Sequence, residues 1–369
     1  MPSPIRRIAI NTGGGDAPGL NAVIRAVVIA AASRHWECYG IRNGYSGILS
    51  PERYPDGGVF LLTPDSVRGI AQQGGTIIGT TNKGDPLHFP VQQPDGTVGE
   101  VDRSDELIAY FARQGLDALV AVGGDGSLTI ANALHQKGLR VIGVPKTIDN
   151  DLDKTFTTFG FNTAVSFATD CLDRLHSTAE SHQRVMVVEV MGRYAGWIAL
   201  HAGIAGGAHS ILIPEIPFDL DKVVAKIQRR DATGRMYSIV VVAEGAEPAD
   251  GQRAVMAPAE TGQSERLGGI GERVAKLIQE RSGKDARLVV LGHLLRGGSP
   301  TSFDRVAALR FGAAAVRALE EGHSGVMVSL AFPNVVYVPL EDVAGRMKAV
   351  PLDSDTLQTA RDLGISFGD

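Results

Sequence analysis

The sequence predicts an α/β protein whose sheets are mostly parallel and covered by helices on both faces. Short runs rich in Val, Ile and Leu alternate with longer amphipathic segments, as expected for buried parallel strands joined by helices. Most of the apolar runs end in a polar or glycine-rich turn. The 369 residues, 44% of them hydrophobic, are enough for roughly two domains of ordinary size.

The expected elements follow one another along most of the chain. Strands are expected over residues 7–12, 116–124, 139–144, 184–192, 209–215, 237–245 and 286–293, and helices over residues 19–34, 127–138 and 194–207. The polar stretch 83–106 is expected to be an exposed excursion, 246–266 a second loop, and 342–369 one or two terminal helices. The pattern alone places a domain break near 155–165. In such a fold, ligands bind at the carboxyl ends of the strands.

Composition excludes several classes of protein. The formal net charge of −5 comes from 36 basic and 41 acidic residues that are mixed along the chain, so no basic block indicates nucleic-acid or membrane binding. Cys38 and Cys171 are too few for a disulfide framework and lack the spacing of a metal knuckle. No signal peptide or run of 18 apolar residues is present, and we expect a cytoplasmic protein.

Two glycine-rich turns lie where expected strands end. The segment GGGDAPGLNAVIRAV, residues 13–27, can present backbone N–H groups to an anion at a helix start, although a simple glycine turn with a helix cap explains it equally well. The segment GGDGS, residues 123–127, repeats the arrangement after a second strand. Asp125 stands between its glycines and can reach a Mg²⁺ ion that bridges phosphate oxygens.

A cluster of charges follows the expected strand 139–144. In PKTIDND, residues 145–151, Asp149 and Asp151 alternate about Asn150, so in an extended segment both carboxylates point the same way. Capping of a helix that begins near Leu152 is the alternative for Asp151 or Asn150, but it leaves Asp149 unexplained. Such crowding of carboxylates favours a metal or substrate site.

Cationic side chains lie near the ends of two later expected strands, 184–192 and 286–293. Arginine is suited to a bidentate grip on a phosphate, and the arginines near these strand ends, Arg184, Arg193, Arg287 and Arg296, indicate a second phosphate site. Taken singly, each is more often a surface or ion-pair arginine. With the glycine loops and the aspartates, they predict phosphoryl transfer between two phosphorylated small molecules, which depends on alignment and charge neutralisation.

These motifs together resemble the phosphofructokinase family over roughly residues 5–330. GGGDAPGLNAVIR, GGDGS, PKTIDND, HQRVMVVEVMGR and GHLLRGGSP occur in the family's order and spacing, although GGDG alone is also found in NAD kinases and lipid kinases. The resemblance implies two doubly wound α/β domains with the active site in the cleft between them. It also implies Mg²⁺-dependent phosphorylation of the 1-hydroxyl of fructose 6-phosphate, a reaction of glycolysis.

The resemblance implies a role for each matching residue. Asp149 would be the general base, and Thr147 and Arg193 would be catalytic with it. Asp125 would be the Mg²⁺ carboxylate. Donor phosphates would be held by residues of the glycine loops and their neighbours, namely Gly15, Asn82, Lys83, Gly124, Asp125, Gly126, Ser127 and Lys146. The sugar phosphate would be bound by Thr147, Asp149, Arg184, Met191, Gly192, Arg193, Glu244, Arg287, His293 and Arg296.

The resemblance also implies a division of the chain and an oligomer. Residues 1–160 with about 295–345 would bind the donor nucleotide, and residues 161–294 with the C-terminal helices 346–369 would bind the sugar phosphate. Arg184 and Arg287 would reach the active site of a neighbouring subunit in a homodimer or homotetramer. No nucleic-acid or membrane partner is expected.

The phosphate donor is predicted to be ATP rather than pyrophosphate. In the family, a second aspartate after GGD crowds the α-phosphate and favours pyrophosphate, whereas Gly126 leaves room for ATP. Lys146 is typical of pyrophosphate enzymes but also occurs in ATP-dependent members. Ile130 stands where ATP-using bacterial enzymes commonly have glycine, and Asn82 stands where many members have arginine. Pyrophosphate therefore remains the alternative donor.

Other classes of protein fit less well. A NAD or lipid kinase would not require PKTIDND or GHLLRGGSP. A non-catalytic regulatory paralogue is disfavoured because Asp125, Asp149 and Arg193 are all present. A dinucleotide-binding dehydrogenase would need GxGxxG at the start of a helix, which the first glycine loop lacks.

Overall fold

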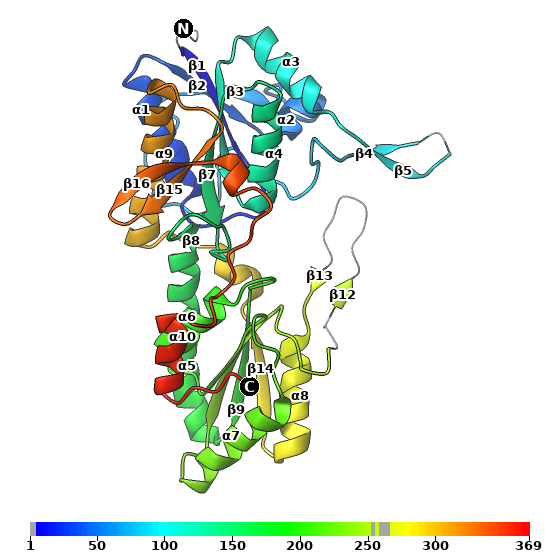
Figure 1. Ribbon diagram of the computed structural model, residues 1–369, viewed down its shortest axis with the longest axis vertical. Coiled ribbons are helices and arrows are strands. Elements are labelled where there is room, and N and C mark those ends of the chain that lie inside the picture. The colour runs from blue at the N-terminus through cyan, green and yellow to red at the C-terminus, as the bar shows by residue number, and fades with distance from the viewer. Residues whose placement is uncertain (1–4, 94, 252–254, 258–265) are drawn as a thin grey trace.

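A computed structural model describes residues 5–93, 95–251, 255–257 and 266–369 of the chain. Two sheets, each covered by helices, lie one above the other in the view of Figure 1. The α/β prediction is confirmed.

The larger sheet has the strand order β16-β15-β7-β6-β1-β2-β3, with β8 paired to β7. Its central strands are parallel, and the outer pairs β2–β3 and β15–β16 are antiparallel. The strands are β1 (Arg7–Thr12), β2 (Glu37–Ile41), β3 (Val59–Leu62), β6 (Ala118–Gly123), β7 (Val141–Thr147), β8 (Phe159–Gly160), β15 (Val326–Ala331) and β16 (Asn334–Pro339).

Helices cover both faces of this sheet. Successive residues of a strand point to opposite sides, and here both sides carry apolar residues that must be buried. Ile8 and Ile10 of β1 share a core with α1 (Leu20–Ala32) and α9 (Ser302–Glu320), whereas Ala9 faces the core of α3 (Ser104–Gln114) and α4 (Asp125–Gln136). Three short elements complete this part: α2 (Ser46–Leu49), η1 (Pro51–Arg53) and η3 (Leu340–Asp342). The double cover explains why β1, β6 and β7 are nearly continuous apolar runs.

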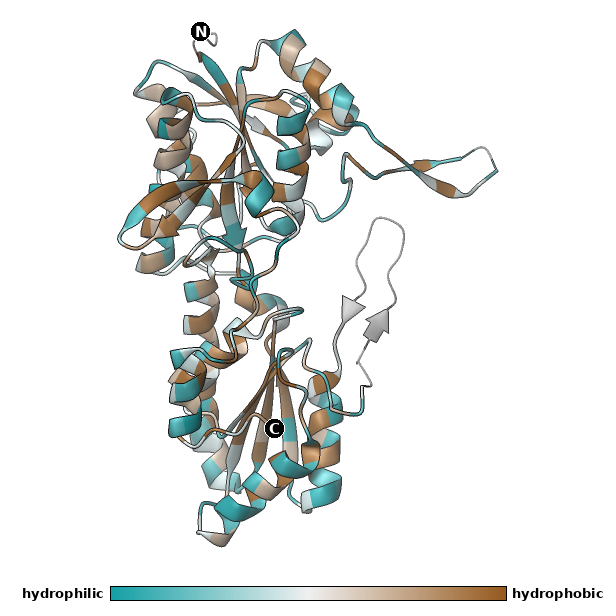
Figure 2. Ribbon diagram, viewed as in Figure 1, coloured by the Kyte–Doolittle hydropathy of each residue, from teal (hydrophilic) through white to brown (hydrophobic). Residues whose placement is uncertain are grey.

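The smaller sheet is entirely parallel, with the order β10-β11-β9-β14. Its strands are β9 (Val185–Val190), β10 (Ser210–Leu212), β11 (Ser238–Ala243) and β14 (Ala286–Val290), followed by η2 (Gly292–Arg296). One face packs on α5 (Phe161–His182), α6 (Trp197–Ala205) and α10 (Asp355–Asp362), and the other on α7 (Leu220–Ala232) and α8 (Ile270–Ser282). Figure 2 shows its apolar strands between helices that carry hydrophilic residues.

Two hairpins stand outside the sheets. The pair β4 (Phe89–Gln92) and β5 (Val98–Val101) projects from the body, as expected for the excursion over 83–106 (Figure 1). Within the second expected loop, β12 (Val255–Ala257) pairs with β13 (Arg266–Leu267), and the remainder of residues 252–265 lies outside the described residues. No helix of the described chain is long and apolar enough to cross a bilayer.

Each strand and helix that the apolar pattern predicts is present, but several further elements were not predicted. The edge strands β3 and β16 are short apolar runs, VFLL and NVVYVP, that are only partly buried, and the long helix α9 is buried around most of its circumference, which weakens the amphipathic pattern. The expectation of a helix that begins near Leu152 is wrong. Residues 148–158 form an irregular loop, and the helix α5 begins only at Phe161.

Candidate active site

A cavity of about 710 Å³ lies where the strands of both sheets end. Its lining comes from the loops after β1, β6 and β7 of the larger sheet and after β9, β11 and β14 of the smaller one. Fifteen predicted site residues line it, namely Gly15, Asn82, Lys83, Gly124, Asp125, Gly126, Ser127, Lys146, Thr147, Asp149, Met191, Arg193, Glu244, His293 and Arg296. Tertiary folding therefore brings together residues from both ends of the sequence.

The first glycine loop is less open than the sequence predicts. The N–H of Gly13 donates to Val122 O (2.9 Å) and the N–H of Gly14 donates to Thr81 O (3.0 Å), so these two groups are not free to bind an anion. The ammonium of Lys146 donates to Gly15 O. This loop contributes a narrow wall held by its neighbours rather than a row of open donors.

The second glycine loop keeps the open geometry. α4 begins at Asp125, and the first N–H groups of a helix have no carbonyl four residues back, so they can bind an anion. Gly123 is required by close packing, because a Cβ there would lie 2.2 Å from the Cβ of Ser127. A Cβ on Gly126 would meet nothing within 4 Å, so this position has room.

The two aspartates of PKTIDND lie on a turn and not on an extended segment. β7 ends at Thr147, and Asn150 adopts a left-handed conformation with φ of 53°, which corrects the predicted alternation. Both Asp149 and Asp151 nevertheless line the cavity. The N–H of Asp149 donates to Thr147 Oγ1 (3.1 Å), so the threonine also fixes the turn.

The Asp149 carboxyl is buried and unusually basic. Its Oδ1 is buried and has no hydrogen-bond partner. Burial, reinforced by the nearby charge of Asp151, raises the pKa of Asp149 to about 7 against the opposing positive charges of Arg296 and Arg193. Asp149 in the ligand-free protein is thus poised between its acid and base forms near neutral pH.

Lys146 lies beside the same carboxylates. Its side chain is buried, and burial together with the charge of Arg296 lowers its pKa to about 7. A Cβ on Gly14 would lie 3.4 Å from its Nζ, which places the ammonium against the first glycine loop. Lys146 is therefore positioned to meet a donor phosphate.

Two carboxylates are available for a divalent cation. Asp125 and Asp151 both line the cavity. Burial is the largest cause of the raised pKa of Asp151, and the negative charge of Asp125 adds to it. No cluster of three or more His, Cys, Asp and Glu ligands occurs among the described residues. Mg²⁺ in phosphate sites commonly uses one or two carboxylates with phosphate and water oxygens, so this pair fits such an ion.

The opposite wall carries the cations and one carboxylate. Arg193 follows β9, Glu244 follows β11, and His293 and Arg296 lie on η2. Burial raises the pKa of the Glu244 carboxyl, and the positive charge of Arg193 works against that shift. Met191 adds an apolar surface to this wall. The wall combines positive charge with hydrogen-bond acceptors, which suits a phosphorylated sugar.

Arg296 connects the two walls. Its Nη1 donates to Asp16 O at 3.2 Å, across 280 positions of sequence. A Cβ on Gly15 would lie 2.6 Å from that Nη1, so glycine is needed for the arginine to approach the loop. The sequence suggested a glycine turn at this position, but the guanidinium that packs against it was not predicted.

Three predicted residues do not line the cavity. Gly192 lies next to it, and its backbone hydrogen-bonds the Glu244 carboxyl, so it supports the wall from behind. Arg184 and Arg287 both form ion pairs with Asp285, at 2.6 Å each, and lie away from this cavity. Their expected role in a neighbouring subunit is not tested by the single chain.

Other lining residues were missed by sequence reasoning. Tyr194 directly follows Arg193, whose guanidinium carbon lies 5.8 Å from its ring centroid. Glu189 is buried, and its Oε2 accepts the N–H of Gly271 at 2.7 Å. A charge inside the apolar strand VMVVEV was the available signal for Glu189. Gly268, Val290 and Gly292 were also missed, whereas Gly14 and Asp151 belong to motifs that the sequence had singled out without assigning these two residues to the site.

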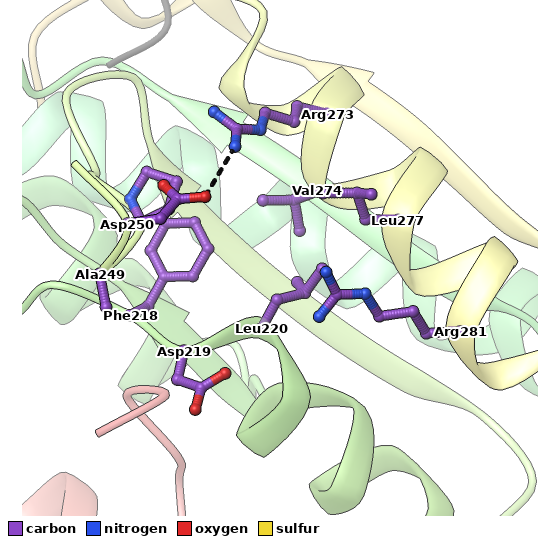
Figure 3. A pocket seen from close by; sticks show the side chains of 10 residues that line it. Phe218, Asp219, Leu220, Ala249, Asp250, Arg273, Val274, Leu277 and Arg281 are labelled. Carbon is purple, nitrogen blue, oxygen red and sulfur yellow. Dashed lines mark hydrogen bonds and ion pairs between the residues drawn. The ribbon is translucent and has the colours of Figure 1, made fainter. Parts of the chain in front are cut away.

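A second cavity, of about 220 Å³, lies between α7 and α8 and contains none of the predicted residues (Figure 3). Its floor includes Phe218, Leu220 and Val274, and an ion pair of 3.3 Å joins Arg273 to Asp250 at its edge. It lacks the glycine loops and the unpartnered buried carboxylate of the larger cavity. The cavity of about 710 Å³ is therefore the candidate active site.

Comparison with known proteins decides the family. The family model described as Phosphofructokinase matches residues 7–319. The chain belongs to the phosphofructokinase family. The resemblance found in the sequence motifs is thereby confirmed.

Individual family members are similar along the whole chain. An ATP-dependent 6-phosphofructokinase of Chloroflexus aggregans is 51% identical, covering 100% of this chain and 99% of its own. A pyrophosphate–fructose 6-phosphate 1-phosphotransferase of Amycolatopsis mediterranei is 47% identical over 94% of this chain and 97% of its own. The phosphofructokinase structure from Saccharomyces cerevisiae has a TM-score of 0.76 at 30% identity, over 91% of this chain and 45% of that longer chain.

Proposed function

We propose that this phosphofructokinase transfers the γ-phosphoryl group of ATP to the 1-hydroxyl of fructose 6-phosphate, giving fructose 1,6-bisphosphate and ADP. The observation that carries the proposal is the place of Asp149. Its unpartnered, buried carboxyl oxygen lies in a cavity with the α4 N-terminus on one side and Arg193, His293 and Arg296 on the other. Relatives about 50% identical and similar over their full length are named ATP-dependent 6-phosphofructokinases.

Asp149 would act as the general base. As the sugar O1 bonds to the γ-phosphorus, the bond from that phosphorus to the bridging oxygen of ADP breaks, and the O1 proton passes to Asp149. A carboxyl with a pKa of about 7 is well matched to this task at neutral pH. Thr147 would hold the turn that carries Asp149, since it accepts the N–H of this residue.

The domain built on the larger sheet would bind the donor. We assign residues 1–160 with about 295–345 to it, and residues 161–294 with 346–369 to the sugar-phosphate domain. N–H groups of the α4 first turn, together with Asn82, Lys83 and Lys146, would hold the donor phosphates. Asp125 and Asp151 would hold Mg²⁺, which when bound neutralises charge on the phosphate oxygens.

The sugar-phosphate end would be completed by a second subunit. The exposed apolar side chains of Val290 and Leu294 line a shallow cavity together with His293 and support self-association next to the site. Arg184 and Arg287, which share Asp285, would reach the partner's sugar phosphate from this region. The assembly would be a homodimer or a homotetramer.

A donor assay tests the proposal. Purified protein is supplied with fructose 6-phosphate and Mg²⁺, and with ATP, ADP or pyrophosphate in turn. We expect turnover with ATP and loss of turnover when Mg²⁺ is chelated. The absence of fructose 1,6-bisphosphate with every donor would reject the proposal.

Pyrophosphate is the second candidate donor, because Lys146 is buried beside the donor loop and a pyrophosphate-dependent relative is 47% identical. Gly126 favours ATP, since the space around it admits a nucleotide α-phosphate. Turnover with pyrophosphate alone would select the second candidate.

Complementation tests the shared site. Asp149→Ser and Arg287→Ala subunits should each be inactive or weakly active alone, and we expect mixed oligomers to regain activity because one intact site forms between different subunits. Mixtures that never exceed the sum of the separate activities would show that Arg287 acts within its own subunit or not at all.

A further inference from the structure

The C-terminal strap, residues 343–350, contacts both metal-site carboxylate loops. It runs from η3 beside the larger sheet toward α10 beside the smaller one (Figure 1). The N–H of Gly345 donates to Asp125 Oδ1 at 2.8 Å, and the N–H of Lys348 donates to Asp151 O at 2.7 Å. The strap lies beyond residues 7–319, which the family model matches, and it carries none of the sequence motifs.

Lys348 is the strap's most heavily bonded side chain. Its ammonium donates to Asn150 Oδ1 (3.2 Å), Thr155 O (2.9 Å) and Phe156 O (3.3 Å). The ammonium also lies 5.5 Å from the centre of the Trp197 ring. One cation thus gathers three oxygens of the loop 148–158, which is not supported by helix or regular strand pairing over most of its length.

Asn150 links the Lys348 ammonium to the carboxylates of Asp149 and Asp151. It sits between Asp149 and Asp151 with φ of 53°, a conformation that is sparsely populated outside glycine. Its Oδ1 accepts both the N–H of Thr158 (3.2 Å) and the Lys348 ammonium. These two hydrogen bonds hold the turn in its left-handed conformation, and the conformation of the turn sets the directions of the Asp149 and Asp151 carboxylates.

The strap is itself anchored on the smaller-sheet side. Trp197 Nε1 donates to Lys348 O at 2.9 Å, and the N–H of Val350 donates to Glu215 Oε1 at 2.8 Å. The same Oε1 accepts the N–H of Gly196 at 3.0 Å, which fixes Glu215 at the start of α6. Lys348 is therefore held at both its main chain and its side chain.

We propose that Lys348 is a positioning residue for the divalent-metal carboxylates, and that the strap around it sets the spacing of Asp125 and Asp151. The inference rests on the proposed function in assigning a metal to these carboxylates. Groups that orient metal ligands from behind commonly change metal affinity by about 10–100-fold when removed. Lys348 touches no donor or sugar ligand by this account, so its effect should appear in metal binding and kcat and not in the KM for fructose 6-phosphate.

Binding of Mn²⁺ alone, followed by the electron paramagnetic resonance of the free ion, tests the inference. Full-length wild type, Lys348→Met and Lys348→Arg are compared at a temperature where near-ultraviolet circular dichroism shows all three folded. We expect K348M to raise the Kd for Mn²⁺ about 10-fold, and K348R, which keeps the cation and its donors, to stay within about three-fold of wild type. Lys276→Met changes an exposed lysine of α8 in the same way and should bind Mn²⁺ as wild type does.

Two results would overturn the inference. One is a folded K348M protein with the wild-type Kd for Mn²⁺, and the other is a K348R protein that loses as much affinity as K348M. Because Mn²⁺ binding needs no fructose 6-phosphate, a failure of the proposed reaction would show in the donor assay alone. In an active enzyme, K348M should also lower kcat while the KM for fructose 6-phosphate changes less than about two-fold.

Discussion

The two ends of the cavity are built by different means. The proposed donor end is mainly backbone: it has Gly14, Gly15, Gly124 and Gly126, the N-terminus of α4 and open space around Gly126, with Asn82, Lys83 and Lys146 as its polar side chains. The acceptor end consists of long side chains, Arg193, Glu244, His293 and Arg296, that project from strand ends of the smaller sheet. Asp149 lies between them.

This difference predicts how each end responds to substitution. Adding atoms to the donor end should change which donor fits, because its selectivity comes from vacant space and fixed N–H groups. Removing atoms from the acceptor end should weaken sugar binding, because its affinity comes from side-chain contacts. A substitution at Asp149 should affect the chemical step and leave both binding events in place.

The largest change in activity is expected for Asp149, which lies between the two ends of the cavity. Asp149→Ser should lower kcat by about 10²–10⁴, the usual loss for a general base, with both KM values within a few-fold of wild type. Steady-state kinetics with saturating ATP measure it. Asp153→Ser, in the same loop but outside the cavity lining, is the matched control and should keep its kcat. A near-normal kcat for Asp149→Ser would refute the assigned role.

A smaller effect is expected at the donor end. Gly126→Asp should reduce kcat/KM for ATP about 100-fold, since a like charge close to the α-phosphate costs several kcal/mol. Gly126→Ala adds a Cβ that meets nothing within 4 Å, so it should retain most ATP turnover. If alanine is as harmful as aspartate, the donor end is not governed by charge and space at this position.

At the proposed acceptor end, a substitution should change the KM for fructose 6-phosphate about 10-fold. His293→Ala would remove the proposed polar contact to the sugar phosphate and should raise the KM for fructose 6-phosphate about 10-fold, corresponding to about 1.4 kcal/mol, with the KM for ATP unchanged. Initial rates with each substrate varied in turn measure it. Equal changes in both KM values would contradict the division into two ends.

The last expected effect concerns stability and not catalysis, and it is measured on the ligand-free protein. The folded pKa of Asp149 is about 7, above its usual 3.8, so ionising this carboxyl disfavours folding. The cost is absent below pH 3.8, grows between the two values and is complete above pH 7. Asp149→Asn stays neutral, and it should therefore raise the free energy of unfolding by about 1–3 kcal/mol at pH 8 but hardly at pH 4.

Denaturant titrations at both pH values measure this difference. A gain that is equal at pH 4 and pH 8 would show that better packing, and not relief of a buried charge, stabilises the asparagine variant.

Local pattern was enough for much of the fold. The apolar runs at 7–12, 116–124 and 184–192 are strands because their residues are buried on both faces of a sheet, a requirement visible in composition. The edge strands β3 and β16 are also short apolar runs, but they pair antiparallel at the sheet edges and so lie outside the alternation of strand and helix that identified the parallel strands. The start of α5 escaped because its boundary depends on contacts such as Asp304 Oδ2 accepting the N–H of Thr163 at 2.7 Å.

Sequence alone was sufficient for the family, the α/β class and most of the residues that line the cavity, since motifs at strand ends are local and the ends of parallel strands share an edge. Packing in three dimensions was needed to show that Asn150 turns left-handed, that Arg296 packs against Gly15, and that Lys348 bonds the loop behind Asp151. Those contacts join segments about 200 to 280 residues apart, and their geometry depends on how the two sheets stack and how the C-terminal strap crosses between them.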